Sequence, residues 1–566
     1  MELSGSQIVI EELKANGVEI AFGIPGGAIM PFYDELNKTK FPHILTRHEQ
    51  GAAHMADGYA RVTGKVAAVV TTSGPGAGNI ITGLCNAKMA SVPMIAITGQ
   101  VSSPTIGTDA FQEADTYGCT IPVTKHNWLI KDPNEIQGIM REAVRVATTG
   151  RPGPVVIDFP KDIQVAMAEY NPRTPAAIGP STDLDAITPE PDTKAIDRLI
   201  DEIGRAKRPV ILAGSGIMKA GASAELAEFA RRSEIPVINT LLGLGGFPGT
   251  DPLFLGMPGM HGTAYANLAL CECDLLINLG GRFDDRVTGK ISSFATGATI
   301  AHVDIDAAEL GKRVETDIPI LADVRDVLVM LNAHVKKKDR QEWLTKVESW
   351  KRDYPLQYDW DGSIKPQYVI EQIQEVSGGN GIYVSGVGQH QMWAAQFIKF
   401  NEPNSWVSSG GLGTMGFGLP AAIGANAGRP DKETWLIDGD GSFSMSLVEL
   451  ATAATYNIPV KIAILNNTYL GMVRQWQELF FDKRYSHVHY PTNPNFAKIA
   501  EGYGVRGFDI KDVDQVRSTL EQAAEIDGPV VMNFHVNQEE NVWPMVPSGA
   551  GNDEMQLGPK DAEKLT

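Results

Sequence analysis

Short apolar runs that end in glycine turns alternate with helical periodicity along most of this chain. That alternation is typical of α/β folds, in which each buried strand is followed by a helix that packs on a parallel sheet. At 566 residues, the chain is also too long for one hydrophobic core to organise. The pattern therefore predicts several doubly wound parallel-sheet domains.

Two breaks in composition divide the chain into three such domains. Prolines crowd segment 169–192 and prevent a continuous helix or a central strand there. A charged, tryptophan-bearing segment, 336–361, is expected to pack as a helical connector. The tail, 546–566, is glycine-rich and is either an active-site lid or a flexible terminus. The predicted domains are 1–168, 193–336 and 362–545.

The first and third domains share a weak internal repeat. Segments 65–99 and 433–467 each run through a buried strand, a glycine turn, a helix and a second strand introduced by proline. Two interpretations are open at this stage. The repeat indicates duplicated domains that share a ligand, or it reflects the general likeness of any two doubly wound domains.

Charge and composition argue against several classes of protein. The formal net charge of −19 opposes nucleic acid or an anionic membrane as the main partner. No stretch approaches the roughly 18 to 20 uninterrupted apolar residues of a spanning helix, and the N-terminus lacks the pattern of a signal peptide. The four cysteines show no paired metal-ligand spacing, so we expect a reduced, cytoplasmic protein.

The sharpest chemical signal is Gly439-Asp440-Gly441 after one strand, followed by Asn466-Asn467 at the end of the next. Both strand ends lie at the carboxyl edge of a parallel sheet, so Asp440 and Asn467 are expected to be close. Their oxygens suit magnesium, and the glycines let backbone amides approach a diphosphate. Each half alone is also a common turn or loop, but the pair at this spacing matches the thiamine-diphosphate signature.

A second signal is Glu49, at the point where a strand joins an alanine-rich helix. Thiamine-diphosphate enzymes need a carboxylic acid beside the aminopyrimidine, to shift a proton on its ring nitrogen. Glu49 is the candidate. The alternative is an exposed first-turn glutamate that the helix dipole favours. The magnesium motif favours the catalytic interpretation.

From about residue 4 to residue 558, the chain resembles the FAD-containing, biosynthetic acetolactate synthase large subunits, a family of thiamine-diphosphate-dependent enzymes. Four segments are more specific than the metal motif: 110–113, 281–289, 410–416 and 471–476. The resemblance implies pyrimidine-binding and diphosphate-binding domains that flank a Rossmann-like central domain. It implies decarboxylation of pyruvate and ligation of the two-carbon unit to a second pyruvate or 2-ketobutyrate, in valine, leucine and isoleucine synthesis.

The resemblance also implies roles for single residues around thiamine diphosphate. Asp440, Asn467 and the main-chain oxygen of Tyr469 would hold magnesium. Met415 would keep the two cofactor rings folded together, although a glycine-flanked methionine is more often ordinary packing. The loop after a predicted strand at 381–387 would contact the diphosphate, and its histidine is by default a structural one. The implied contacts are Gly388, Gln389, His390, Gly439 and Gly441.

The middle domain has its own nucleotide-binding pattern. Segment 210–216 reads as a strand with a glycine turn and segment 300–306 as a strand ending in acids, but a full dinucleotide fingerprint is missing. By resemblance this domain binds FAD, which would be structural or vestigial because the reaction involves no net oxidation. The implied FAD contacts are Arg151, Gly214, Gly216, His261, Arg282, Asp304 and Asp323.

The implied substrate contacts come from all three domains. Trp476 would favour 2-ketobutyrate in the acceptor pocket, unless it is a core aromatic, and Arg282 would also contact the acceptor carboxylate. Phe111, Gln112 and Lys161 would line the approach, with Gln112 near the reacting atoms; an exposed lysine is ordinarily only solvated. Because the first and third domains hold the cofactor halves, the resemblance implies a homodimer or tetramer. A small regulatory subunit is a further expected partner.

Three alternatives stay open. Another thiamine-diphosphate enzyme, such as pyruvate oxidase or glyoxylate carboligase, would share the metal motif but should lack Trp476 combined with segment 282–289. The FAD-independent catabolic acetolactate synthase would lack the flavin. A non-catalytic homologue is disfavoured because Glu49, Asp440 and Asn467 are all present.

Overall fold

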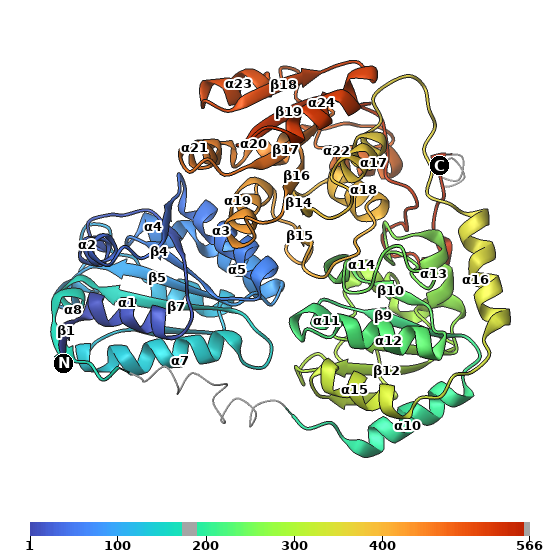
Figure 1. Cartoon of the computed structure of the whole chain (residues 1–566), viewed down its shortest axis with the longest axis horizontal. Coiled ribbons are helices and arrows are strands. Elements are labelled where there is room, and N and C mark those ends of the chain that lie inside the picture. The colour runs from blue at the N-terminus through green and yellow to red at the C-terminus, as the bar shows by residue number, and fades with distance from the viewer. Residues whose placement is uncertain (173–188, 560–566) are drawn as a thin grey trace.

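Three parallel sheets organise the computed structural model, which describes residues 1–172 and 189–559 (Figure 1). The first sheet has the order β3-β2-β4-β5-β7-β6. Its central strands are buried on both faces, as parallel strands covered by helices are. The strands are β2 (Ala21–Gly23), β3 (His43–Leu45), β4 (Ala67–Thr71), β5 (Met94–Gln100), β6 (His126–Leu129) and β7 (Pro154–Pro160).

Helices cover both faces of this first sheet. Helix α1 begins with a capping box, in which Ser4 and Gln7 each accept a hydrogen bond from the other's main chain. A short antiparallel pair, β1 (Glu2–Ser4) and β8 (Met167–Glu169), closes the domain. The helices are α1 (Gly5–Ala15), α2 (Met30–Thr39), α3 (Glu49–Thr63), α4 (Pro75–Asn79), α5 (Ile81–Met89), α6 (Thr116–Thr120), α7 (Ile136–Thr148) and α8 (Lys161–Val165).

The third domain repeats the topology of the first. Its sheet has the order β15-β14-β16-β17-β19-β18, so both six-stranded sheets read 2-1-3-4-6-5 when the strands of each sheet are numbered in chain order. The shared order favours duplication over general likeness as the origin of the sequence repeat. The strands are β14 (Ile382–Ser385), β15 (Trp406–Ser408), β16 (Thr434–Gly439), β17 (Val460–Asn466), β18 (Arg506–Ile510) and β19 (Val530–His535).

The helices of the third domain include the one that begins at the metal motif, α20, which starts at Asp440. They are α17 (Pro366–Val376), α18 (Gln389–Phe397), α19 (Gly418–Gly428), α20 (Asp440–Ser444), α21 (Leu450–Thr455), α22 (Gly471–Phe480), α23 (Phe496–Gly502) and α24 (Asp514–Ala524).

The central domain has a five-stranded parallel sheet in the doubly wound order β10-β9-β11-β12-β13. Its strands are β9 (Pro209–Ala213), β10 (Val237–Asn239), β11 (Leu275–Leu279), β12 (Thr299–Asp304) and β13 (Ile318–Leu321). Its helices are α10 (Thr193–Arg205), α11 (Gly216–Lys219), α12 (Ser223–Ser233), α13 (Ala264–Glu272), α14 (Asp285–Thr288) and α15 (Val324–His334).

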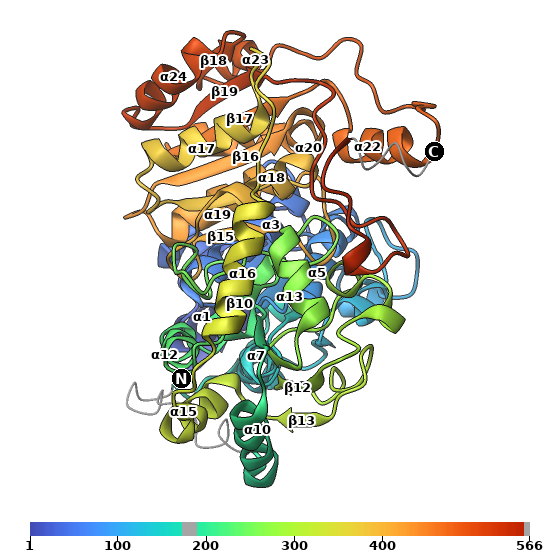
Figure 2. The same ribbon diagram turned by 90° about the vertical axis from the view of Figure 1, so that its right-hand side faces the viewer.

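The segment between the central and third domains is a helical connector, as its composition predicted. Helix α16 (Gln341–Asp353) packs on the central domain beside α13 (Figure 2). Trp343 and Trp350 anchor it, and the indole Nε1 of Trp343 donates to the carbonyl of Pro209 at 3.1 Å. The other predicted break lies mostly at 173–188, outside the described residues.

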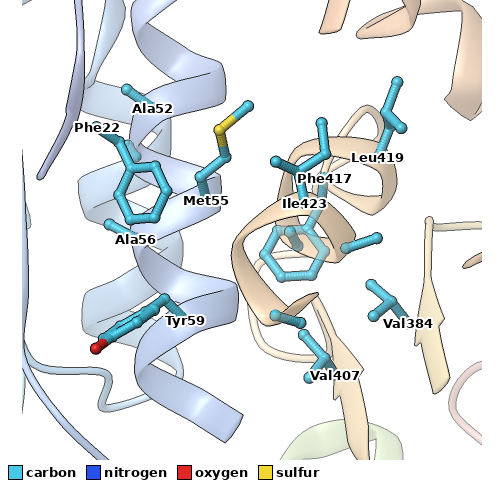
Figure 3. Packing of buried hydrophobic residues seen from close by; sticks show 14 of the residues in the cluster. Phe22, Ala52, Met55, Ala56, Tyr59, Val384, Val407, Phe417, Leu419 and Ile423 are labelled. Carbon is cyan, nitrogen blue, oxygen red and sulfur yellow. The ribbon is translucent and has the colours of Figure 1, made fainter. Parts of the chain in front are cut away.

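Helices α3 and α19 join the first and third domains through one shared hydrophobic cluster (Figure 3). Met55 of α3 points toward α19, where Ile423 lies, whereas Ala52 points toward Phe22 on the opposite side of α3, and all four are buried. The helices touch backbone to backbone, because a Cβ on Gly424 would collide with the carbonyl of Met55. The first residue of α3 is Glu49. The contact between the two domains therefore sets the position of that carboxylate.

None of the helices formed by residues 1–172 and 189–559 is both long and apolar enough to cross a membrane.

Candidate functional site

One cavity of about 850 Å³ lies between the domains. It follows the carboxyl ends of β14 and β16 in the third sheet and of β9 and β11 in the central sheet, where the strand order reverses and ligands of such sheets bind. Every predicted site residue of these two domains lines it, together with one from the first domain. They are Arg151, Gly214, Gly216, His261, Arg282, Asp304, Asp323, Gly388, Gln389, His390, Met415, Gly439, Asp440, Gly441, Asn467, Tyr469 and Trp476.

Asp440 and Asn467 meet at the third-domain end of this cavity. Strands β16 and β17 pair in parallel with Gly439 opposite Leu465, so the residues that follow emerge at one edge. The main-chain N–H of Asn467 donates to the Asp440 carboxyl group. On its other side, Asn493 Nδ2 donates to Asp440 Oδ2 at 2.6 Å. The two sequence motifs therefore form a single polar corner.

The chemistry of this corner fits a magnesium ion. Asp440 is 1% exposed, and burial raises its pKa to about 6 despite the hydrogen bond from Asn493. A bound cation would offset the cost of holding that buried carboxylate ionised. The side chain of Asn467 lies beside it and accepts from the Tyr469 N–H at 3.0 Å. A carboxylate, an amide oxygen and a main-chain carbonyl are the hard donors that magnesium takes.

Two glycines keep space open beside His390. A Cβ on Gly439 would lie 2.7 Å from His390 Nδ1, and one on Gly388 would lie 3.0 Å from the same nitrogen. His390 Nε2 faces the buried carboxylate of Asp438 at 3.3 Å. The bare glycine turns leave main-chain amides accessible at the strand ends, which is what a diphosphate requires.

The central-domain end of the cavity fits a nucleotide. A Cβ on Gly214 would collide with the carbonyl of Gly280, so the two glycine turns approach each other with no side chain between them. Asp304 is the last residue of β12, Asp323 lies two residues after β13, and both line the same wall. These acids are suited to ribose hydroxyls, as in other doubly wound nucleotide sites.

Arg151 brings a cation from the first domain to this end. Its guanidinium forms ion pairs with Glu309 at 2.7 Å and with Asp306 at 3.3 Å, both in the central domain. Lys219 lines the same part of the cavity. Burial, together with the nearby charge of Arg61, lowers the pKa of Lys219 to about 7. A phosphate group bound beside Lys219 would favour the charged form of the lysine and so oppose the effects of burial and of Arg61 on its pKa.

Trp476 lies on α22 under the guanidinium of Arg286, whose Cζ is 5.7 Å from the indole centroid. The described part of the tail, 546–559, packs against residues 287–290, which follow Arg286 in the chain. The carbonyl of Ala550 accepts from the Lys290 N–H at 3.0 Å, and Asn552 Nδ2 donates to the carbonyl of Val287 at 3.0 Å. The tail thus packs on the segment that carries Arg286, and its movement as a lid stays a prediction.

The other four first-domain candidates stand apart from the cavity within a single chain. Glu49 accepts a hydrogen bond from Asn79 Nδ2 at 2.9 Å. The main-chain carbonyl of Gln112 packs against Gly74, in the turn that precedes the helix of Asn79. Phe111 is 89% exposed, and Lys161 is exposed at the start of α8. The described residues that line the cavity do not include these four candidates: Glu49, Phe111, Gln112 and Lys161.

Comparison with known proteins identifies the family. Models of the thiamine pyrophosphate enzymes match residues 3–119 (N-terminal TPP binding domain), 196–331 (central domain) and 386–534 (C-terminal TPP binding domain). The chain is 47% identical to the acetolactate synthase large subunit of Corynebacterium glutamicum, over 98% of this chain and 90% of that relative. It is 44% identical to the acetolactate synthase isozyme 2 large subunit of Escherichia coli, over 98% and 99% respectively. This chain belongs to the acetolactate synthase large subunits.

Family membership confirms the resemblance that the sequence motifs indicated. The three matched domains also confirm the predicted fold class of three doubly wound domains. Each matched segment lies within one predicted domain, and only the central one approaches both of the predicted bounds. The exact domain boundaries and the role of each site residue in this acetolactate synthase relative stay predictions.

Sequence reasoning missed several residues that support the site. Asn493 and Asp438 hold Asp440 and His390, and Lys219 lines the nucleotide end. Glu449 of the third domain accepts hydrogen bonds from the main-chain N–H groups of residues 47 and 48, just before α3. Only Asp438 carried a signal, because it directly precedes the metal motif. Asn493 and Glu449 lie far in sequence from the groups that they contact.

Proposed function

We propose that this chain is the catalytic subunit of an acetolactate synthase that decarboxylates pyruvate and ligates the two-carbon unit to a second 2-ketoacid. The observation that carries the proposal is the single cavity in which Asp440, Asn467, His390, Met415 and Trp476 come together. The names of its relatives support the reaction type, since both are named acetolactate synthases and the match covers 90% and 99% of their lengths.

Magnesium and thiamine diphosphate are the cofactors that the third domain would hold. Asp440, Asn467 and the Tyr469 carbonyl would bind the metal, and the main-chain amides beside Gly388 and Gly439 would bind the diphosphate. Bound thiamine diphosphate supplies an electron sink for loss of carbon dioxide from a 2-ketoacid. Met415, which lines the cavity next to these groups, would hold the cofactor rings in their folded arrangement.

Glu49 would act from a second copy of the chain. In a single chain it does not line the cavity; it begins α3 and contacts Asn79, in the segment that follows Gly74, against which the Gln112 carbonyl packs. Large apolar side chains are exposed on both half-sites, among them Phe111 in the first domain and Phe481 in the third. In a homodimer or tetramer, Glu49 would place its carboxyl group against the cofactor pyrimidine and move a proton there.

The substrate end of the cavity would discriminate between acceptors. The indole of Trp476 offers an apolar face to the additional methylene group of 2-ketobutyrate, and Arg282 and Arg286 supply positive charge for the carboxylate. Phe111, Gln112 and Lys161 of the partner would close the approach. Exclusion of water by these apolar groups would favour ligation over simple protonation.

FAD would occupy the central-domain end of the cavity as a structural cofactor. The glycine turns of Gly214 and Gly280, the acids Asp304 and Asp323, and Arg151 form a wall that fits a dinucleotide. Two relatives are named large subunits, which supports a small regulatory subunit as partner. A cytoplasmic location stays a prediction from the cysteine usage.

Incubation with pyruvate, with and without magnesium and thiamine diphosphate, tests the proposal. We expect carbon dioxide and acetolactate only when both cofactors are present, and acetohydroxybutyrate when 2-ketobutyrate is added. Acetyl phosphate with consumption of oxygen, or tartronate semialdehyde from glyoxylate, would indicate another enzyme of the superfamily. No decarboxylation by fully loaded protein would indicate a non-catalytic homologue, and a flavin spectrum of the purified protein would test for FAD.

A further inference from the structure

A chain of buried polar side chains crosses from the first domain to the loop that carries Met415. Asp57 on α3 accepts from Asn86 Nδ2 of α5 at 3.0 Å. Asn86 Oδ1 in turn accepts from Ser409 Oγ at 2.6 Å, and Ser409 Oγ accepts from the main-chain N–H of Thr414 at 2.9 Å. Asp57, Asn86 and Ser409 are at most 1% exposed. Residue 415 directly follows the last hydrogen-bonded group of this chain.

The direction of every hydrogen bond in the chain is fixed. Ser409 has one hydroxyl proton, so it donates to Asn86 and accepts from Thr414. Asn86 must then present its oxygen to Ser409 and its NH₂ group to Asp57, which as a carboxylate can only accept. No other arrangement satisfies all three side chains. A buried network with one solution specifies one geometry.

A second connection pins the same loop at its start. Arg61 Nε donates to the other carboxylate oxygen of Asp57 at 2.5 Å, and Arg61 Nη1 donates to the carbonyl of Ser408 at 2.9 Å. Gln391 Nε2, from helix α18, which also contains His390, donates to Ser408 Oγ at 2.7 Å. The first domain and the diphosphate-binding helix therefore hold one end of the loop together.

The glycine content of the loop makes this anchoring necessary. Residues 410, 411, 413 and 416 are glycines, and Gly413 and Gly416 have φ values of 75° and 85°. Glycines lose more conformational freedom on ordering than other residues, so the loop has little intrinsic preference for one shape. The polar chain fixes Ser409 and Thr414 of this loop from outside the third domain, and Ser442 Oγ of the third domain accepts from the Gly416 N–H at 3.2 Å.

We propose that Asn86 is a positioning residue of the active site, which transmits the fixed geometry of α3 and Asp57 to the Met415 loop through Ser409. This inference rests on the proposed function only in the role it gives to Met415. Asn86 touches neither cofactor nor substrate; it acts through Ser409. The same helix that begins at Glu49 thus also sets the shape of the loop in its own chain's cavity.

The test compares Asn86→Ala and Ser409→Ala with Asn332→Ala, which removes a buried asparagine of the central domain that donates to the Glu225 carbonyl at 2.9 Å. We expect both site variants to lower kcat at least about 10-fold, because an error of about 1 Å in catalytic geometry can cost roughly 100-fold. The KM for pyruvate and the calorimetric Kd for thiamine diphosphate should stay within about threefold. The control should keep the wild-type kcat.

Exchanging the two side chains provides a rescue. Asn86→Asp alone places two carboxylates face to face and should be nearly inactive. In Asp57→Asn/Asn86→Asp, every donor again meets an acceptor and the net charge is unchanged, so activity should return to within about threefold of wild type. An exchange variant no more active than Asn86→Asp, or an Asn86→Ala variant with wild-type kcat, overturns the proposal.

A readout without turnover separates this proposal from the proposed function. Near-ultraviolet circular dichroism of the protein loaded with thiamine diphosphate and magnesium reports the arrangement of the bound cofactor rings. We expect Asn86→Ala to lose the induced signal, and the exchange variant to regain it. An unchanged signal in Asn86→Ala refutes the positioning role even if the wild type produces acetolactate, whereas a wild type that makes no acetolactate refutes only the function.

Discussion

Because helices α3 and α19 touch through their backbones, we expect a single methyl group added at position 424 to lower the stability of the protein strongly. Gly424 of α19 lies against the backbone of Met55, and a Cβ at position 424 would intrude more than 1 Å inside the 3.0 Å that real Cβ atoms keep from other atoms. The obstacle is a carbonyl oxygen within a helix, so it cannot rotate away as a side chain would. In Gly424→Ala, the helices must therefore separate by about 1 Å.

Two opposing terms set the magnitude. Overpacking of a well-packed core costs about 1–3 kcal/mol, and a backbone obstacle places this case at the upper end. Alanine is favoured over glycine inside a helix by about 1 kcal/mol, which offsets part of that cost. The net loss is about 2 kcal/mol. For a cooperative unit of about 180 residues, this lowers Tm by roughly 4–8 °C.

Differential scanning calorimetry of the full chain measures the effect. The matched control is Gly138→Ala in α7, where a Cβ would meet no atom within 4 Å, so this variant should melt at or slightly above wild type. Because α3 begins with Glu49, we also expect Gly424→Ala to lower kcat. The reasoning is refuted if Gly424→Ala melts no lower than wild type while the control behaves as expected.

Three further predictions address the site and the pH dependence of stability. Glu49→Gln should lower carbon dioxide release from pyruvate by about 10²–10⁴-fold, with magnesium binding and Tm unchanged; near-normal release would exclude it as the proton-transferring acid. Trp476→Leu should lower the ratio of acetohydroxybutyrate to acetolactate, with both acceptors present, by about 10-fold, and an unchanged ratio would place the indole outside the acceptor pocket. Asp158→Asn should change how stability depends on pH. Burial raises the pKa of Asp158 to about 7, against the hydrogen bonds from Gln100 and Thr98. Between pH 4 and 7 the folded wild type therefore keeps a proton that the unfolded chain releases, and its stability falls as pH rises through this range. Asp158→Asn should lack this loss of stability, which amounts to at most about 4 kcal/mol in the wild type. Parallel Tm profiles of the variant and the wild type from pH 4 to 8 would contradict the prediction.

The metal corner shows how far sequence reasoning reaches. Asp440 and Asn467 each directly follow a strand that the apolar pattern predicted, and parallel strands bring such positions to one edge of the sheet. That Asp440 and Asn467 lie close together could be predicted from the local sequence pattern alone. Asn493, which orients Asp440, comes from a loop with no pattern of its own, so nothing in the sequence predicted that contact. Glu449 and Asn86 were missed because their partners, Arg47 and Ser409, lie more than 300 residues away in sequence.

The sequence by itself predicted the alternation of strands and helices, the glycine turns and the chemical types of the candidate cofactor ligands, because these depend on neighbours within a few residues. The tertiary structure alone decided that α3 packs on α19 at Gly424, that a buried polar chain holds the Met415 loop, and that Glu49 lies outside its own chain's cavity. Those features depend on how two separately folded sheets dock. Docking is set by the shapes of whole surfaces, which no local periodicity records.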